Sequence, residues 1–114
     1  MKKPVEIIVL KDAELFIDSL EAIIKKKIFF VFNKTKQGIK GEWFKKMAGT
    51  GDIYEFRIKQ KGYIRLFAFW DNTGNEKVLI ITTHGIIKKS AKTPPKEIAK
   101  AEQIRINYFN SKQK

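Results

Sequence analysis

The sequence predicts one α+β domain built on an antiparallel sheet. Three strand-like runs follow one another in the middle of the chain, and segments with helical periodicity lie before and after them. A chain of 114 residues is long enough to bury one modest core. Residues 1–114 are therefore assigned to a single domain.

The first third of the chain predicts a strand and then helix. Val5 to Leu10 is a short run rich in β-branched residues, expected at a sheet edge or beside the C-terminal strands. Residues 13–36 predict two consecutive helices or one kinked helix, with Asp12 as one N-cap and Asp18 with Glu21 as a second capping signal. The expected core positions of this stretch share one helix face: Ile24, Ile28, Val31, Phe32 and Thr35.

Two segments in this region allow more than one interpretation. Phe29 to Phe32 fits a buried strand as well as a helix, and we favour the helix. Residues 37–51 contain four glycines and predict a connecting loop, in which Trp43 and Phe44 pack onto the body of the domain.

The second half predicts a three-stranded meander followed by a helix. The strand-like runs cover residues 52–59, 63–71 and 77–83, separated by turn signals. Residues 84–94 predict a basic loop, and the proline pair after Thr93 starts a helix that extends to about Phe109.

Charge favours a polyanionic partner. Lys and Arg total 24 against 12 for Asp and Glu, a net charge of +12. Such an excess attracts phosphates, whereas the alternative is that the charge merely keeps the domain soluble. The absence of cysteine excludes disulfides, thiolate zinc sites and cysteine nucleophiles and suits the cytoplasm. The N-terminal apolar run is too short for a signal peptide, so neither secretion nor membrane spanning is expected.

The central hairpin predicts two neighbouring arginines. If its turn is centred near Lys61, Arg57 lies opposite Arg65, with both side chains expected on the exposed face. Like charges directly opposite each other on neighbouring strands destabilise a sheet. The arginine pair therefore needs either Glu55 or an external anion such as phosphate. The alternative is that one arginine pairs with Glu55 and the other is solvated.

Several segments in this order resemble the RelE/ParE toxin superfamily, most closely its phage-derived, HigB-type branch. The segments that carry the resemblance are Asp52–Ile58, Gly62–Phe67, His84-Gly85 and Lys88–Pro94, together with Phe16–Leu20. The resemblance implies a compact α+β fold: a twisted antiparallel sheet with an N-terminal helical pair on one face, a basic concave surface on the other, and a C-terminal helix.

The resemblance also implies the toxin of a type II toxin–antitoxin system, a metal-independent endoribonuclease that cuts mRNA in the ribosomal A site. The expected partners are this mRNA and a helix-turn-helix antitoxin encoded beside the toxin, and no cofactor is expected. The positions matching the family's phosphate-binding and catalytic cations are Arg57, Arg65, Lys88 and Lys89, with His84 as a candidate acid or base. Four residues are predicted to bind RNA: Lys59, Lys61, Lys92 and Thr93.

Two departures from the family's pattern bear on mechanism. Ile86 replaces an aromatic residue that is common after the His-Gly pair, and Glu55 stands where some relatives carry a second lysine, which leaves the general base unassigned. A single histidine at a strand end is also more often structural than catalytic. Two other functions stay open: a gyrase poison of the same fold, and a non-catalytic RNA-binding or ribosome-binding protein.

Overall fold

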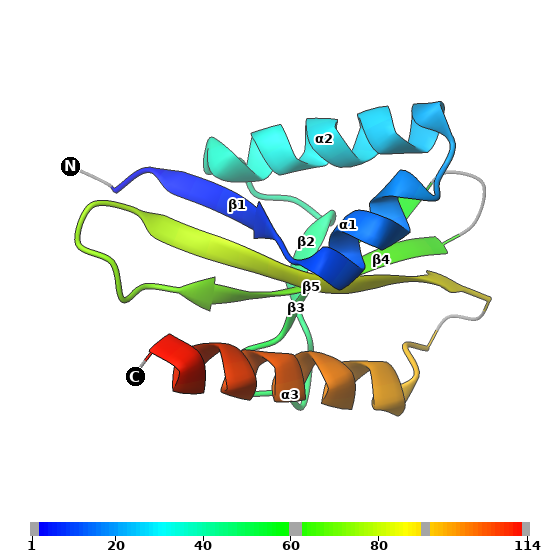
Figure 1. Ribbon diagram of the computed structural model, residues 1–114. Coiled ribbons are helices and arrows are strands. Elements are labelled where there is room, and N and C mark those ends of the chain that lie inside the picture. The colour runs from blue at the N-terminus through cyan, green and yellow to red at the C-terminus, as the bar shows by residue number, and fades with distance from the viewer. Residues whose placement is uncertain (1–2, 60–62, 90–91, 113–114) are drawn as a thin grey trace.

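The computed structural model describes residues 3–59, 63–89 and 92–112 and has the predicted α+β architecture (Figure 1). A five-stranded sheet in the order β1-β5-β4-β3-β2 separates two helical layers. This arrangement is consistent with the RelE-like fold that the resemblance implies. The elements are β1 (Val5–Val9), α1 (Lys11–Asp18), α2 (Ala22–Lys36), β2 (Phe44–Lys46), β3 (Tyr54–Lys59), β4 (Tyr63–Asp71), β5 (Val78–Lys88) and α3 (Pro95–Lys112).

The sheet is mixed, so the prediction of a purely antiparallel sheet was wrong in one respect. β1 lies at the edge beside β5, as predicted, but runs parallel to it, with Val5 opposite Val78. The helices between β1 and the meander carry the chain across the sheet, which permits a parallel pairing. The other pairs are antiparallel, and the predicted pairing of Arg57 with Arg65 is confirmed.

The N-terminal helical pair packs on one face of the sheet. α1 and α2 are separate helices, and the buried residues of α2 are the five predicted core positions. Phe29 to Phe32 is helical, as favoured. The predicted caps were wrong, because the helices begin after Leu10 and Glu21, and neither has a side-chain cap hydrogen bond among the described residues.

α3 covers part of the opposite face and extends to Lys112, beyond the predicted end. Ala101, Tyr108 and Phe109 of α3 pack with Phe67 and Phe69 of β4 in a second core cluster. Both faces of the sheet therefore carry helices. The face opposite the N-terminal helical pair, expected to be a basic concave surface, is exposed only where α3 does not cover it.

Two strands differ from prediction. β2 lies within the predicted 37–51 loop, where Phe44 pairs with Phe56. β5 continues to Lys88, through the first part of the predicted basic loop, because β-branched Ile86 and Ile87 extend its pairing with β4.

A β-bulge in β5 determines which side chains face α3. Phe67 pairs with His84, but the next residue of β4, Ala68, pairs with Thr82, so Thr83 is the extra residue. Beyond the bulge, His84, Ile86 and Lys88 lie on the α3 face, whereas an unbroken alternation from Ile81 would place them on the opposite face.

Gly85 lies on the other face, where α1 approaches β5 closely. A Cβ atom built on Gly85 would lie 2.3 Å from a ring carbon of Phe16 and 2.7 Å from Leu66. Glycine at this position therefore lets the Phe16 ring of α1 pack directly on β5.

Candidate nucleic-acid interface

Three cations gather on the α3 face of the sheet, at the end that α3 leaves uncovered. The register places Arg57 of β3 opposite Arg65 of β4, and Arg65 opposite Ile86 of β5, one position along its face from Lys88. We call Arg57, Arg65 and Lys88, together with Glu55, the cationic cluster. The cluster depends on the hairpin register and on the bulge, since both must hold for the three strands to present cations side by side.

Glu55 lies between the two arginines. Its Oε1 atom is 2.9 Å from Arg57 Nε and 3.4 Å from Arg65 Nε, and its Oε2 atom accepts a hydrogen bond from Thr93 Oγ1 at 3.2 Å. Glu55 is buried, which corrects the expectation that this face of β3 points to solvent or substrate. The arginines and Thr93 cover it because they bond to its carboxylate. Glu55 is thus the internal anion that the paired arginines require.

The two arginines differ in exposure, and the prediction that both are exposed was wrong for Arg65. The Arg57 side chain is 34% exposed, but that of Arg65 is 8% exposed. Arg65 is paired on both sides, with Arg57 and with Ile86, whereas the pairing of β2 with β3 ends at Phe56. Burial lowers the pKa of Arg65 from its ordinary value, although Glu55 opposes this effect. Its Nε atom has no hydrogen-bond partner among the described residues, apart from the longer ion pair with Glu55. Arg65 is thus held by its ion pair with Glu55 and by the donation of Nη1 to Ile64 O at 3.1 Å.

Lys88 is a strand residue and is buried, so its prediction as part of a basic loop was wrong. Burial lowers the pKa of Lys88, the charge of Arg65 lowers it further, and Glu55 opposes both. A lysine with a lowered pKa releases its proton more readily and can act in acid–base chemistry nearer neutrality.

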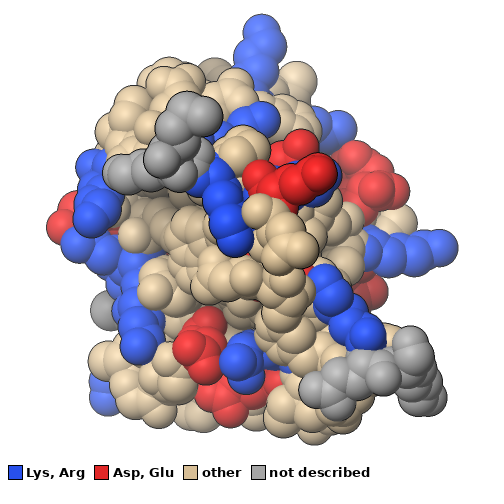
Figure 2. Space-filling view, turned by 90° about the vertical axis from the view of Figure 1, so that its left-hand side faces the viewer, with Lys and Arg blue, Asp and Glu red and all other residues tan. Residues whose placement is uncertain are grey.

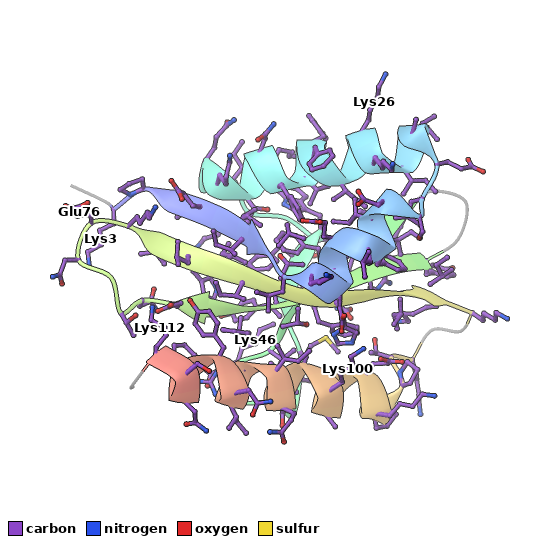
Figure 3. The ribbon with its side chains drawn as sticks, viewed as in Figure 1. Lys3, Lys26, Lys46, Glu76, Lys100 and Lys112 are labelled. Carbon is purple, nitrogen blue, oxygen red and sulfur yellow. The ribbon has the colours of Figure 1, made fainter. Side chains whose placement is uncertain are left out.

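A pocket of about 720 Å³ opens over the cluster. Lys92 and Thr93, predicted to bind RNA, line its wall before α3, and Lys46 of β2 lines the opposite wall. Lys46 lies on the α3 side of the sheet (Figure 3). Sequence reasoning missed Lys46 because it treated residues 37–51 as a loop, although a lysine pair after two aromatic residues was a usable signal.

Two further predicted residues lie outside this pocket. Lys59 and Lys89 line a neighbouring groove, which also reaches Arg57 and Arg65. Lys61 lies outside the described residues. In the part of the chain that the structure describes, no group of three or more His, Cys, Asp or Glu side chains could hold a metal ion.

A family model described as phage-derived protein Gp49-like matches residues 15–105 of the chain. The chain belongs to this family. The match includes every member of the cationic cluster and both walls of its pocket. A search among curated proteins finds no match to this Gp49-like protein. Among its described helices, none is both long and apolar enough to cross a membrane.

His84 of the Gp49-like protein is sealed under α3, away from the pocket. Its ring stacks on Phe67 at a centroid distance of 4.8 Å, Nε2 lies 3.2 Å from Glu97 Oε1, and Nδ1 lies 2.9 Å from Thr83 Oγ1. The carboxylate favours the tautomer in which Nε2–H donates to Glu97. Burial and then the charge of Lys100 lower the pKa of His84, which Glu97 opposes. This geometry suits a neutral structural histidine, and its predicted role in acid–base chemistry stays a prediction.

Proposed function

We propose that this Gp49-like protein is the toxin of a type II toxin–antitoxin system, of the RelE/HigB type, and that it cuts mRNA on the ribosome. The observation that carries the proposal is the cationic cluster, in which Glu55 holds Arg57 and Arg65 side by side next to Lys88. Preorganised cations stabilise negative charge where it develops in a transition state.

In the proposed reaction the 2′-hydroxyl of one nucleotide gives its proton to solvent water, and its oxygen attacks the adjacent phosphorus. The bond from phosphorus to the 5′-oxygen breaks, which leaves a 2′,3′-cyclic phosphate and a 5′-hydroxyl. Arg57 and Arg65 stabilise the added charge on the phosphate oxygens, and Lys88, protonated, gives its proton to the leaving 5′-oxygen. The ribosome contributes by fixing the 2′-oxygen in line with the bond that breaks, so free RNA reacts poorly.

Cleavage of end-labelled mRNA tests this function, with programmed ribosomes and free mRNA compared at the same protein concentration. We expect cleavage on the ribosome, cyclic-phosphate ends, and full protection by a single 2′-deoxy substitution at the cut site. Efficient metal-dependent cutting of free RNA would refute the proposal.

A non-catalytic RNA-binding or ribosome-binding protein is the second candidate. The small exposed fraction of Arg65 and the engagement of both Glu55 oxygens favour it, because a satisfied cluster also suits binding without chemistry. Ribosome binding without any cleavage would support this candidate instead.

A further inference from the structure

A second basic cavity joins the cationic cluster and contains residues that the proposed reaction does not use. This cavity, which we call the α2 groove, has a volume of about 760 Å³ and lies between α2 and the end of the β3–β4 hairpin. It exists because β2 is only three residues long: beyond the pairing of Phe44 with Phe56, the described residues add no strand to this edge of β3. Arg57 N donates to Trp43 O at 2.8 Å, which places Trp43 at the groove wall.

The lining of the α2 groove is strongly positive. Six cations line it: Lys27, Lys34, Arg57, Lys59, Arg65 and Lys89. Glu42 is the one carboxylate among the described lining residues, and it is already paired with Lys45 at 3.2 Å and with Arg57 at 4.0 Å. A polyanion therefore meets several cations along one channel.

Aromatic rings alternate with these cations. Three aromatic residues line the groove: Phe30, Trp43 and Tyr63. The rings of Phe30 and Tyr63 are 57% and 47% exposed, which is unusual for large rings. Lys34 Nζ is 3.7 Å from the centre of the Trp43 ring and 5.3 Å from that of Phe30. Exposed rings beside cations form the usual platform for single-stranded nucleic acid, because every base has a face that can stack.

We infer that the α2 groove binds single-stranded RNA next to the phosphate held by the cationic cluster. Arg57 and Arg65 line both cavities, so a strand with one phosphate at these arginines continues directly into the groove. The lysines bind its neighbouring phosphates, and the exposed rings of Phe30 and Tyr63 stack with its bases close to Trp43. This inference rests on the proposed RNA substrate, but it assigns a binding site that cleavage itself does not require.

Intrinsic fluorescence tests the inference directly. The chain has two tryptophans, and Trp70 does not line the α2 groove. On titration with a short single-stranded RNA, we expect emission to be quenched in Trp70→Phe, which reports Trp43, and to stay constant in Trp43→Phe. Quenching of equal size in both variants would overturn the placement of the RNA beside Trp43.

A charge-matched pair of variants tests the phosphate contacts. Lys27→Gln with Lys34→Gln removes two groove cations, whereas Lys26→Gln with Lys36→Gln removes two from elsewhere on the same helix, Lys26 pointing away from the sheet (Figure 3). We expect the groove variant to bind the RNA about tenfold more weakly and to lower the salt dependence of binding by about 1.4 in the log–log slope. The control should match the parent. Equal losses in both variants would overturn the site.

Two further measurements separate this inference from the proposed function. If RNA binding depends on the groove but no ribosomal cleavage occurs, the nuclease function is rejected and the RNA-binding groove stands. If the groove variant binds RNA as tightly as the parent and cleavage is intact, the groove is rejected and the nuclease function stands. An oligoglutamate peptide of matched charge serves as the second ligand. If the groove variant loses affinity for this peptide as much as for RNA, the groove recognises acidic protein segments and the inference fails.

Discussion

Glu55 is the residue around which the cationic cluster is arranged. Its carboxylate contacts Arg57, Arg65 and Thr93, so it links β3, β4 and the segment before α3. With both oxygens engaged, Glu55 acts as a positioning residue that lets two like charges remain adjacent. In the proposed function, a substrate phosphate would be a second anion, added to arginines that are already held in place.

Arg57→Ala should separate catalysis from stability. We expect ribosome-dependent cleavage to fall by about 100-fold, the usual loss for a donor to a developing oxyanion, and growth arrest to be relieved. The melting temperature should stay near that of the parent because Arg57 is partly exposed. Arg105→Ala is the matched control, since its side chain is also 34% exposed and ion-paired, but on α3. Arg65→Ala should lose cleavage too, with some loss of stability because Arg65 is buried.

If Arg57→Ala and Arg65→Ala both cut ribosome-bound mRNA at the parental rate, the cluster is not the active site. Equal losses in Arg57→Ala and Arg105→Ala would show instead that overall charge, and not position, controls the activity.

The sequence predicted the arginine pair but left its surroundings open. Arg57 and Arg65 could be paired because a short hairpin fixes its own register. The link to Thr93 joins residues 38 positions apart, and no local pattern encodes it. The place of Lys88 depends on the bulge at Thr83, which a simple alternation of faces does not predict.

Stability should depend on His84 in mildly acidic solution. Burial lowers the pKa of His84, so the folded state favours the neutral ring, and stability is lost as pH falls below the ordinary value of 6.5. We expect His84→Gln to reduce this loss, measured by urea unfolding at pH about 7.5 and about 5.5. An unchanged difference between the two pH values would contradict the assignment of His84 as buried and neutral.

At the scale of elements, α3 is anchored at its C-terminal end by Asp71 of β4. Tyr108 Oη donates to Asp71 Oδ2 at 2.6 Å and Lys112 Nζ at 2.8 Å, while the backbone N–H of Thr73 donates to Oδ1 at 2.9 Å. Burial would raise the pKa of Asp71, but the hydrogen bonds from Lys112, Thr73 and Tyr108 outweigh it and hold the pKa well below its ordinary value. Because these partners lie far along the chain, the sequence predicted the helix without its anchor.

Asp71→Asn should loosen α3. Loss of a buried charged acceptor costs about 1–3 kcal/mol in the free energy of unfolding. The parent should lose stability as pH falls below the ordinary value of 3.8 for Asp71, and the variant should lose less, since a depressed pKa contributes stability above that value. Urea unfolding at several pH values measures both effects. Asp52→Asn is the control, because its ion pair with Arg105 is exposed and should contribute little. Equal destabilisation by both variants would count against the anchor.

At the scale of the whole molecule, the charged side chains are distributed differently at its two ends. The end that carries the β4–β5 connection shows acidic and basic side chains side by side (Figure 2), and Lys77 pairs there with Glu6 at 3.0 Å. The opposite end holds the cationic cluster and the α2 groove, in which cations outnumber carboxylates. One end of the molecule is therefore the more positive, and its field would orient the molecule relative to an approaching polyanion.

Reversal of one charge at this end should reduce ribosome engagement. Lys88 is buried, so the exposed Lys89 is the better position, and Lys36→Glu on α2 is the matched control. We expect Lys89→Glu to weaken ribosome binding and to lower its salt dependence, because one favourable phosphate contact becomes repulsive. Binding of the proposed antitoxin should weaken less if that partner grips mainly the helices. Equal ribosome affinity for the two variants would remove Lys89 from the functional surface.

The pairing of β1 with β5 sets the order in which a growing chain can complete the domain. Val5 leaves the ribosome early but must wait for Val78, its partner across the sheet, and Glu55 must wait for Thr93. Contacts this far apart in sequence form late and slowly, because closing the loop costs entropy before the contacts repay it. A nascent chain therefore carries an unfinished cluster until Thr93 has been made. Until then, the two arginines lack the contact between Glu55 and the segment before α3.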